Sequence, residues 1–378
     1  MLMDAKHDGP STPTRIDLVI GTRPNIVKAA PLLKALTQAD WCKAQLVYLM
    51  QHTDASLADE PMEDLGIPAE HPVRLRLSTS GYGNRLGEMM ASYSDHLLRT
   101  KPDLVVVFGD VDTTLAAAYA AKRQHIRLAH VEAGLRSGDR SMPEELNRLM
   151  VDAISDIHFT TTEQAHRQLL AEGHPRENVH HVGNLMIDSL LETVDREHGR
   201  QVCRRLGLNP ASFGLATFHR PSNVDTREAL LAIVAMLRAA SQHIPLVLPL
   251  HPRTRSSLQR FGFEEELASI PGLLITNALR YRDFVSLLSL AKVVMTDSGG
   301  MQEECSVLGV HCLTVRENTE RPETLHLGSN QLVAPRAAPD VLNNVLSDPA
   351  PNSANIPLWD GATGKRISAI LQQYLRQD

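Results

Sequence analysis

Short apolar runs alternate with longer amphipathic segments along almost the whole chain, and this alternation limits the possible folds most strongly. It predicts βαβ units and a parallel sheet, because parallel strands need a crossover segment that is usually helical. In the first half, the runs that we expect to form buried strands are residues 16–20, 45–50, 104–108 and 127–131. In the second half they are residues 213–217, 245–250, 272–276, 292–296 and 310–315.

Two such sets of runs predict an α/β protein with two Rossmann-like, doubly wound parallel-sheet domains that face a central cleft. A chain of 378 residues is long for one core and suits two domains. The charged residues 191–212, which include Asn-Pro near their end, are the expected linker. The other expected parts are a disordered polar leader (1–14), an N-terminal domain (15–190), a C-terminal domain (213–360) and a last amphipathic helix (361–378) that packs back on the N-terminal domain.

Composition excludes several classes of protein. The net charge of −6 offers no basic stripe for a nucleic acid. The four cysteines are scattered without a CxxC pair, so we expect reduced thiols rather than a metal site or disulfides. The first residues carry no apolar run, and no stretch approaches the roughly 20 apolar residues of a membrane helix. We therefore expect a cytoplasmic protein with no membrane partner.

The first expected strand runs into the motif GTRPN, residues 21–25. Gly21 lets the backbone approach a ligand, and the helix that follows favours an anion at its N-terminus. Arg23 adds donors that a phosphate can accept. A tight turn with a solvated arginine explains this motif equally well when it is taken alone.

Acidic residues follow the next expected strands. Asp110 comes after one strand and Glu132 after another, while Asp112 is the better candidate for capping the following helix. Glu144 and Glu145 open a helix, where the helix dipole favours a carboxylate in any protein, so one of them needs no further role. Grouped carboxylates raise one another's pKa, which is the usual arrangement for proton transfer.

The second half carries a nucleotide-binding pattern. His219 and Arg220 follow a strand, where they can polarise a sugar or phosphate oxygen. Residues 298–300, Ser-Gly-Gly, form a turn that opens a helix and suits a diphosphate. Glu304 lies one helical turn later and can accept hydrogen bonds from a ribose diol, and Arg321 is close behind.

Other ligand-binding motifs are missing from the sequence. There is no GxxxxGK[ST] loop, no GxSxG elbow and no GxGxxG after the first strand, so no nicotinamide cofactor is expected. No metal is expected either, because these scattered histidines have no metal-ligand spacing: His7, His125, His158 and His174.

These motifs occur in the order found in non-hydrolysing UDP-N-acetylglucosamine 2-epimerases, which the chain resembles from about Arg15 to its end. The motifs are GTRPN, QH, FGDVDTT, HVEAGLRSGD, PEELNR, HR, TDSGGMQEE and TERPE. The resemblance implies a GT-B fold, usually as a homodimer. It also implies that UDP-N-acetylglucosamine and UDP-N-acetylmannosamine are interconverted without an added cofactor. The family's proposed route is elimination of UDP to a bound 2-acetamidoglucal, followed by re-addition.

The resemblance also implies roles for individual residues. The catalytic positions are Asp110, Glu132, Glu144 and His219. The positions that bind the UDP-sugar are Arg23, Arg136, Asn147, Arg148, Arg220, His251, Ser298, Gly299, Gly300, Glu304 and Arg321. Gln51 and His52 correspond to a second, activating UDP-sugar site of bacterial relatives. Asn25 stands where many members have Glu, and Phe218 where many have Gly, which argues against that activation more than against the chemistry.

Three alternatives remain open at this stage. A GT-B glycosyltransferase shares the fold and uses a UDP-sugar donor. A hydrolysing epimerase shares the first elimination but releases N-acetylmannosamine. A non-catalytic nucleotide-sugar sensor is the third, and it does not need all of the acids. Within the family itself, the sugar can also be a diacetamido-uronic acid.

Overall fold

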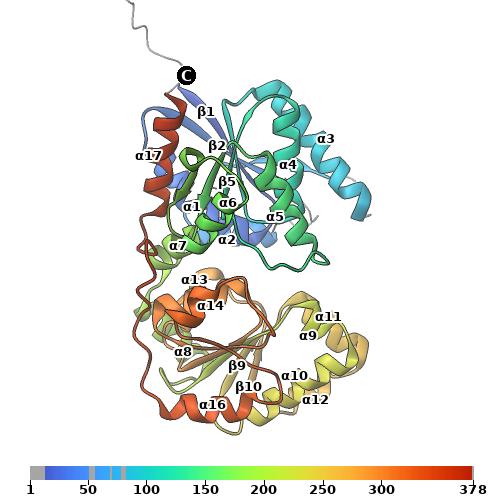
Figure 1. Ribbon diagram of the computed structural model, residues 1–378. Helices are drawn as coiled ribbons and strands as arrows, with labels where there is room; N and C mark the ends of the chain where they lie inside the picture. The colour runs from blue at the N-terminus through green and yellow to red at the C-terminus, as the bar shows by residue number, and fades with distance from the viewer. Residues whose placement is uncertain (1–12, 51–55, 69, 78–81, 377–378) are drawn as a thin grey trace, which may run out of the picture. The chain divides into compact units, whose positions relative to one another are not determined.

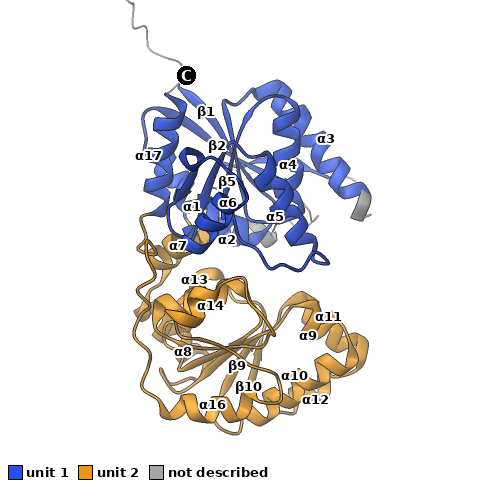
Figure 2. Cartoon of the chain, viewed as in Figure 1, with its two compact units in different colours: residues 1–62, 66–185, 363–378 blue, residues 63–65, 186–362 orange. Residues whose placement is uncertain are grey.

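The structure is a computed structural model that describes residues 13–50, 56–68, 70–77 and 82–376. Gln51, His52 and most of the expected leader lie outside these described residues. The chain forms two compact units (Figure 2). Unit 1 comprises residues 1–62, 66–185 and 363–378, and unit 2 comprises residues 63–65 and 186–362.

Unit 1 is built on a 7-stranded parallel sheet in the order β3-β2-β1-β4-β5-β6-β7 (Figure 1). The order reverses between β1 and β4, which is the switch point of a doubly wound sheet. The side chains of β4 are all buried, as expected for a strand covered on both faces. The strands are β1 (Thr14–Ile20), β2 (Cys42–Met50), β3 (Val73–Arg76), β4 (Leu104–Phe108), β5 (Arg127–Val131), β6 (Ile157–Thr160) and β7 (Val179–His181).

Helices cover this sheet, with α1 and α17 on one side and α3, α4 and α5 on the other (Figure 1). The last helix, α17, returns to unit 1 and packs closely on α1, since a Cβ on Gly364 would lie 2.8 Å from the carbonyl oxygen of Pro31. The helices are α1 (Arg23–Thr37), α2 (Ser56–Asp64), α3 (Tyr82–Thr100), α4 (Asp112–Arg123), α5 (Pro143–Ile154), α6 (Glu163–Ala171), the 3₁₀ turn η1 (Arg176–Asn178) and α17 (Thr363–Leu375).

Unit 2 has a 6-stranded parallel sheet in the order β10-β9-β8-β11-β12-β13, which again reverses at its centre. Its strands are β8 (Gly214–Thr217), β9 (Leu246–Pro249), β10 (Leu273–Thr276), β11 (Val293–Thr296), β12 (His311–Thr314) and β13 (Asn330–Leu332). Its helices are α7 (Leu185–Thr193), α8 (Arg196–Leu206), α9 (Pro221–Val224), α10 (Arg227–Ala240), α11 (Pro252–Phe261), α12 (Glu264–Ala268), α13 (Tyr281–Leu288), α14 (Gly299–Leu308), α15 (Pro322–His326) and α16 (Ala338–Ser347). The predicted α/β class with two doubly wound sheets, as in GT-B proteins, is confirmed.

Residues 191–212 are not the domain linker that their charge and the Asn-Pro pair suggested, because α8 occupies half of them and the segment belongs to unit 2. The Asp195 side chain caps this helix by accepting hydrogen bonds from the N–H groups of the second and third residues that follow it. Gly207 ends it in the left-handed conformation, with φ of 69°. A narrow apolar face that includes Val202 and Cys203 is buried in the core of unit 2. The two units instead divide between Leu185 and Met186.

Across the described residues, no helix is both long and apolar enough to span a membrane. The same residues contain no group of three or more His, Cys, Asp or Glu side chains arranged to hold a metal ion. All four cysteines are buried and free.

Candidate active site

Asp110 follows the carboxyl end of β4 after Gly109, whose φ of 64° is left-handed and favours glycine. Helix α4 then begins at Asp112, and its N-cap is Val111, which has no side-chain capping bond. The prediction that Asp112 caps this helix is therefore wrong. Asp112 lies in the first helical turn, where it accepts a hydrogen bond of 3.2 Å from Nδ2 of Asn147.

Two residues of α5 hold Asp110. Asn147 donates to the Asp110 carbonyl oxygen at 2.8 Å, and the Arg148 guanidinium forms an ion pair with the Asp110 carboxylate. The Arg148 side chain is only 5% exposed, whereas that of Asp110 is 29% exposed. The carboxylate is thus fixed on one side by a buried cation and open on the other.

The structure separates the roles of the adjacent acids Glu144 and Glu145. Glu145 is buried and accepts hydrogen bonds from the backbone N–H groups of Ser137 and Gly138, at 2.9 and 3.0 Å. Burial raises the pKa of Glu145, but these N–H groups and Arg148 outweigh it, so the pKa lies below its ordinary value. Glu145 is therefore the structural member of the pair. Glu144 is exposed in the first turn of α5.

Glu132 follows β5 and is held in an unusual conformation. Its φ is 69°, which for a residue other than glycine costs on the order of 1–3 kcal/mol and marks many functional sites. The side chain is almost buried and forms an ion pair with Lys28 of α1. A Cβ on Gly109 would lie 3.0 Å from Lys28 Nζ and 3.2 Å from Glu132 Oε2, so this ion pair lies against the residue before Asp110.

Lys28 was not among the residues predicted from the sequence. Its signal was its position on α1, about one turn after the GTRPN motif, at the carboxyl end of the sheet. The sequence suggested that these carboxylates are grouped with one another, and the structure adds a cation beside each of two of them. Glu132 and Asp110 each face a cation, Lys28 and Arg148 respectively.

The GTRPN turn ties α1 to the residues after β4. A Cβ on Gly21 would lie 1.9 Å from Oγ1 of Thr113, so only glycine fits there. Asn25 is buried and donates through Nδ2 to the carbonyl oxygen of Phe108 at 3.2 Å. A glutamate at this position could not donate that bond, which gives Asn25 a local structural role. Arg23 is exposed at the start of α1.

Arg136 lies near Glu132 in the sequence but is bound by other acids. Its guanidinium is 2.7 Å from an oxygen of Asp152 and 2.6 Å from one of Glu172. Burial lowers the pKa of Arg136, but these two carboxylates outweigh burial and raise it. The side chain is 12% exposed, and both of its acidic partners belong to unit 1.

In unit 2, Asp297 holds the loop that carries His219 and Arg220. This fully buried carboxylate follows β11 and accepts hydrogen bonds from the N–H groups of His219 and Arg220, each at 3.0 Å, and from Asn223 Nδ2 at 3.1 Å. It also lies 3.1 Å from Nδ1 of His219. The ring of His219 stacks obliquely on that of His251, with centroids 5.1 Å apart. The family resemblance implied a site role for each of these histidines, but Asp297 was not predicted.

The Ser-Gly-Gly turn opens α14 as predicted. Ser298 is the N-cap but makes no side-chain capping bond, and the helix starts at Gly299. A Cβ on Gly299 would lie 2.5 Å from Nη1 of Arg321, so the guanidinium lies directly against the first turn. Arg321 donates to Glu303 at 2.7 Å, and both Glu303 and Glu304 are buried. A helix N-terminus beside a guanidinium is suited to a diphosphate.

Three guanidinium groups surround the buried carboxylate of Glu320. Arg316 binds it through two hydrogen bonds of 2.9 and 3.0 Å, while Arg220 and Arg321 lie 3.8 and 3.7 Å away. Burial raises the pKa of Glu320, but the arginines outweigh it, so the pKa is well below its ordinary value. Burial and the neighbouring Arg316 lower the pKa of Arg220. With Glu303, which binds Arg321, the cluster has three guanidinium groups against two carboxylates, and this excess of positive charge favours an anionic ligand.

The raised pKa of Glu323 predicts that the stability of the protein depends measurably on pH. Burial and the charge of Glu303 raise its pKa from 4.5 to about 7. Between these values the folded state keeps a proton that the unfolded state has lost, so the contribution of Glu323 to stability falls as pH rises from 4.5 to about 7. Glu323→Gln is neutral at every pH, so it should exceed the wild type in unfolding free energy by about 1–3 kcal/mol at pH 8.

Urea unfolding at pH 5 and pH 8 measures this difference. The gap between variant and wild type should be much smaller at pH 5, where the folded wild type is also neutral at this position. Glu317→Gln, an exposed acid in the same segment, is the matched control and should show no such change. An equal gap at both pH values would contradict the assignment.

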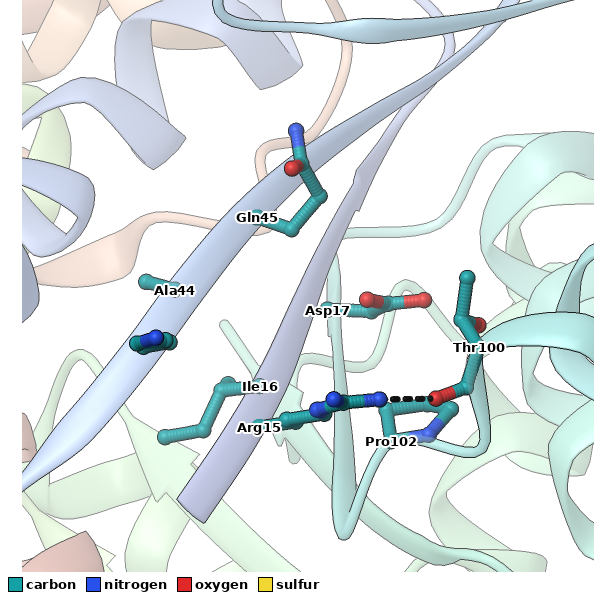
Figure 3. A pocket seen from close by; sticks show the side chains of 8 residues that line it. Arg15, Ile16, Asp17, Ala44, Gln45, Thr100 and Pro102 are labelled. Carbon is teal, nitrogen blue, oxygen red and sulfur yellow. Dashed lines mark hydrogen bonds between the residues drawn. The ribbon is translucent and has the colours of Figure 1, made fainter. Parts of the chain in front are cut away.

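Unit 1 also contains a hollow of about 210 Å³ away from these residues (Figure 3). It lies where β1 and β2 begin, with Asp17, Gln45 and Pro102 among its lining residues. Arg15 donates across its edge to the carbonyl oxygen of Thr100 at 3.1 Å. Asp110 and Glu132 follow the opposite, carboxyl ends of their strands, which is where ligands of doubly wound sheets bind. The hollow is therefore not the candidate site.

The likeness to known proteins covers almost the whole chain. A family model described as UDP-N-acetylglucosamine 2-epimerase matches residues 34–372. The chain is similar to a UDP-N-acetylglucosamine 2-epimerase of Methanococcus maripaludis, with 36% identity over 364 residues, 94% of this chain and 98% of the relative. It is also similar to a UDP-2,3-diacetamido-2,3-dideoxy-D-glucuronate 2-epimerase of Pseudomonas aeruginosa, with 37% identity over 332 residues, 87% of this chain and 90% of the relative.

A solved structure agrees with these relatives. The crystal structure of Methanocaldococcus jannaschii UDP-GlcNAc 2-epimerase in complex with UDP-GlcNAc and UDP has a TM-score of 0.86 and 34% identity, and the match covers 95% of this chain and all of that one (100%). The family model alone spans far more than half of the sequence. The chain therefore belongs to the UDP-N-acetylglucosamine 2-epimerase family.

Proposed function

We propose that this chain interconverts UDP-N-acetylglucosamine and UDP-N-acetylmannosamine by inverting carbon 2 of the sugar. One observation carries the chemical part of the proposal. Asp110 and Glu132 follow neighbouring strands of one sheet, and each carboxylate is held by its own cation. Glu132 also keeps a strained backbone conformation of the kind that clusters at functional sites.

The proposed reaction has two steps. A carboxylate removes the C2 proton while the C1–O bond to UDP breaks, which leaves a C1=C2 double bond in a 2-acetamidoglucal. UDP then rejoins C1 through its phosphate oxygen, and an acid returns a proton to the opposite face of C2. The C2 proton has no neighbouring carbonyl to acidify it, so departure of UDP must carry much of the developing charge. We assign Asp110, Glu132 and Glu144 to the proton transfers, with His219 as a further catalytic residue.

The residues of unit 2 fit the nucleotide part of this substrate. We assign the diphosphate to the start of α14, where Gly299 and Gly300 supply N–H groups and Arg321 supplies a guanidinium. Glu304 then accepts from the ribose hydroxyls, and Arg220 adds positive charge. In unit 1, we assign Arg23 to binding of the UDP-sugar. We assign Asn147 and Arg148 to the pocket around Asp110. Arg136, His251 and Ser298 keep the substrate-binding roles that the family resemblance implies.

A second sugar is a specific alternative. The relative from Pseudomonas aeruginosa is as similar in sequence as the one from Methanococcus maripaludis, and its name specifies a diacetamido-glucuronate nucleotide. The two substrates share UDP and the acetamido group on C2, so the same acids could serve both. They differ at C3 and C6, where the glucuronate carries a second acetamido group and a carboxylate. Only a direct comparison of the two substrates distinguishes them.

Proton NMR of the purified protein in deuterated water tests the proposal. With UDP-N-acetylglucosamine alone, we expect UDP-N-acetylmannosamine to appear and deuterium to enter C2 of both sugars. Free N-acetylmannosamine and UDP would indicate the hydrolysing reaction instead. If only the diacetamido-glucuronate nucleotide exchanges its C2 proton, the reaction stands and the sugar assignment changes. No exchange with either nucleotide would contradict the proposed function.

We further propose that the protein is a homodimer that uses the outer faces of α4 and α5 in unit 1. These helices lie side by side (Figure 1). They expose Tyr119, Leu146 and Met150 by 45%, 43% and 44%, and the two residues on α5 are one turn apart. Exposed apolar side chains on adjacent helices favour association with another protein surface.

The oligomeric state should change when this surface becomes charged. We expect the double substitution Leu146→Glu and Met150→Glu to give a monomer in sedimentation equilibrium, at concentrations where the wild type is a dimer. Both side chains are exposed within the unit, so unit 1 should still fold, and circular dichroism checks this. Leu231→Glu, an equally exposed leucine in unit 2, is the control. A wild-type protein that is monomeric at all concentrations would contradict the proposal.

A further inference from the structure

His130 is fully buried on β5, two residues before Glu132, and both of its ring nitrogens face hydrogen-bond acceptors. Nδ1 lies 2.6 Å from the carboxylate of Asp152, and Nε2 lies 2.8 Å from the carbonyl oxygen of Gly109. A carbonyl oxygen can only accept, so Nε2 must carry a proton. The carboxylate of Asp152, when ionised, can also only accept, so both ring nitrogens of His130 face acceptors.

Asp152 is itself held in its ionised form. Burial raises the pKa of Asp152, but His130 and Arg136 outweigh it and lower the pKa to about 2. The carboxylate is therefore ionised throughout the working range of pH. Its second oxygen accepts from the backbone N–H of Gly134 at 3.1 Å and lies 2.7 Å from the Arg136 guanidinium. A buried carboxylate with these partners is a rigid anchor for the histidine.

These contacts reach the backbone on both sides of the proposed acids. The carbonyl that His130 binds belongs to the peptide joining Gly109 to Asp110. The N–H that Asp152 binds belongs to Gly134, two residues after Glu132. Gly109 and Gly134 both have left-handed φ values, 64° and 81°, so each turn is held in a conformation that few residues adopt. The His130–Asp152 pair thus links the turns that present Asp110 and Glu132.

We propose that His130, held as an imidazolium by Asp152, is a positioning residue that fixes the turns carrying Asp110 and Glu132. The role rests on the proposed function, because these two acids are its proposed catalytic groups. His130 touches neither carboxylate and acts through the backbone. Displacing a catalytic group by about 1 Å from its productive position can lower turnover by about 10²-fold. The nucleotide-binding residues of unit 2 should keep their positions when His130 is replaced, so UDP binding should be unaffected.

His130→Asn tests the positioning role. The amide can still donate toward Asp152, but it is too short to reach the Gly109 carbonyl as well. We expect kcat for epimerisation to fall by about 10²-fold, while KM and the affinity for UDP stay near wild type. His158→Asn is the matched control: His158 is buried on the neighbouring strand β6 and also contacts Asp152, through its backbone oxygen, at 2.9 Å. It has no contact with Gly109 or Gly134 among those described, so its kcat should change little.

The outcomes separate the possible failures. Wild-type kcat in His130→Asn, or an equal fall in the His158→Asn control, would overturn the positioning role. Loss of C2 exchange in the wild type with both sugar nucleotides would instead overturn the proposed function.

Nitrogen NMR of wild-type protein labelled in its histidines tests the charge state of His130 directly. This test depends neither on enzymatic activity nor on folding of the His130→Asn variant. We expect one buried histidine with both ring nitrogens protonated, and we expect Asp152→Asn to convert it to the neutral ring, since an amide nitrogen donates to Nδ1. A neutral His130 in the wild type would overturn the proposal.

Discussion

Glu132→Gln is expected to fold and to bind UDP like the wild type, while its turnover falls by about 10²–10⁴-fold. The amide has nearly the shape of the carboxylate but cannot take up a proton from C2. The backbone keeps the same strain, because glutamine in the left-handed region costs about as much as glutamate. Lys28 loses its ionic partner, but the amide oxygen can still accept a hydrogen bond from its Nζ, so the variant should fold with some loss of stability. Epimerisation measured by NMR and UDP binding measured by titration calorimetry separate the two effects.

The other two acids should lose turnover as well, but they should differ in stability. Among the described residues, Asp110→Asn leaves the buried Arg148 with Glu145 as its one acidic partner, so this variant should also unfold more easily. Glu144→Gln changes an exposed side chain and should be as stable as the wild type. Glu163→Gln, an exposed acid that begins α6, is the control for both. Wild-type turnover in any of the three acid variants would remove that residue from the chemistry.

Much of the fold was predictable because buried parallel strands have a strong sequence signal. The strands β4 and β5 have the predicted bounds, residues 104–108 and 127–131, since continuous apolar runs are typical of strands covered on both faces. Shorter strands nearer the edges were not predicted. β7 and β13 have 3 residues each, too few for any periodicity to stand out.

The placement of the candidate acids after strands was predictable, but the residues that pair with them were not. Asp110 and Glu132 were assigned because they follow strands, and strand ends of a parallel sheet meet at one edge. Their partners come from other elements: Lys28 is 104 residues from Glu132, and Arg148 is 38 residues from Asp110. Such contacts depend on how helices pack on the sheet, which no local pattern encodes. The linker prediction was wrong for a related reason. Most residues of α8 are charged or polar, so its narrow buried face was not recognised in the sequence.

Arg321→Ala is expected to weaken UDP binding by roughly 1.5–3 kcal/mol, or about one to two decades in Kd. The side chain is only 14% exposed and lies against Gly299 at the start of α14, where we assign the diphosphate. Its planar fork can bind two phosphate oxygens at once. The guanidinium is oriented by a hydrogen bond to Glu303, whose side chain is buried. The loss should therefore appear in binding of UDP itself, measured by titration calorimetry.

A second substitution distinguishes charge from geometry at this position. Arg321→Lys keeps the positive charge beside Glu303 but has no fork, so its UDP affinity should lie between that of the wild type and that of Arg321→Ala. Arg282→Ala, an exposed arginine of the same unit paired with Asp195, should bind UDP like the wild type. If Arg321→Ala keeps full affinity, the diphosphate does not bind at α14. If Arg321→Lys binds UDP no more tightly than Arg321→Ala, the geometry of the guanidinium, rather than its charge, selects the diphosphate.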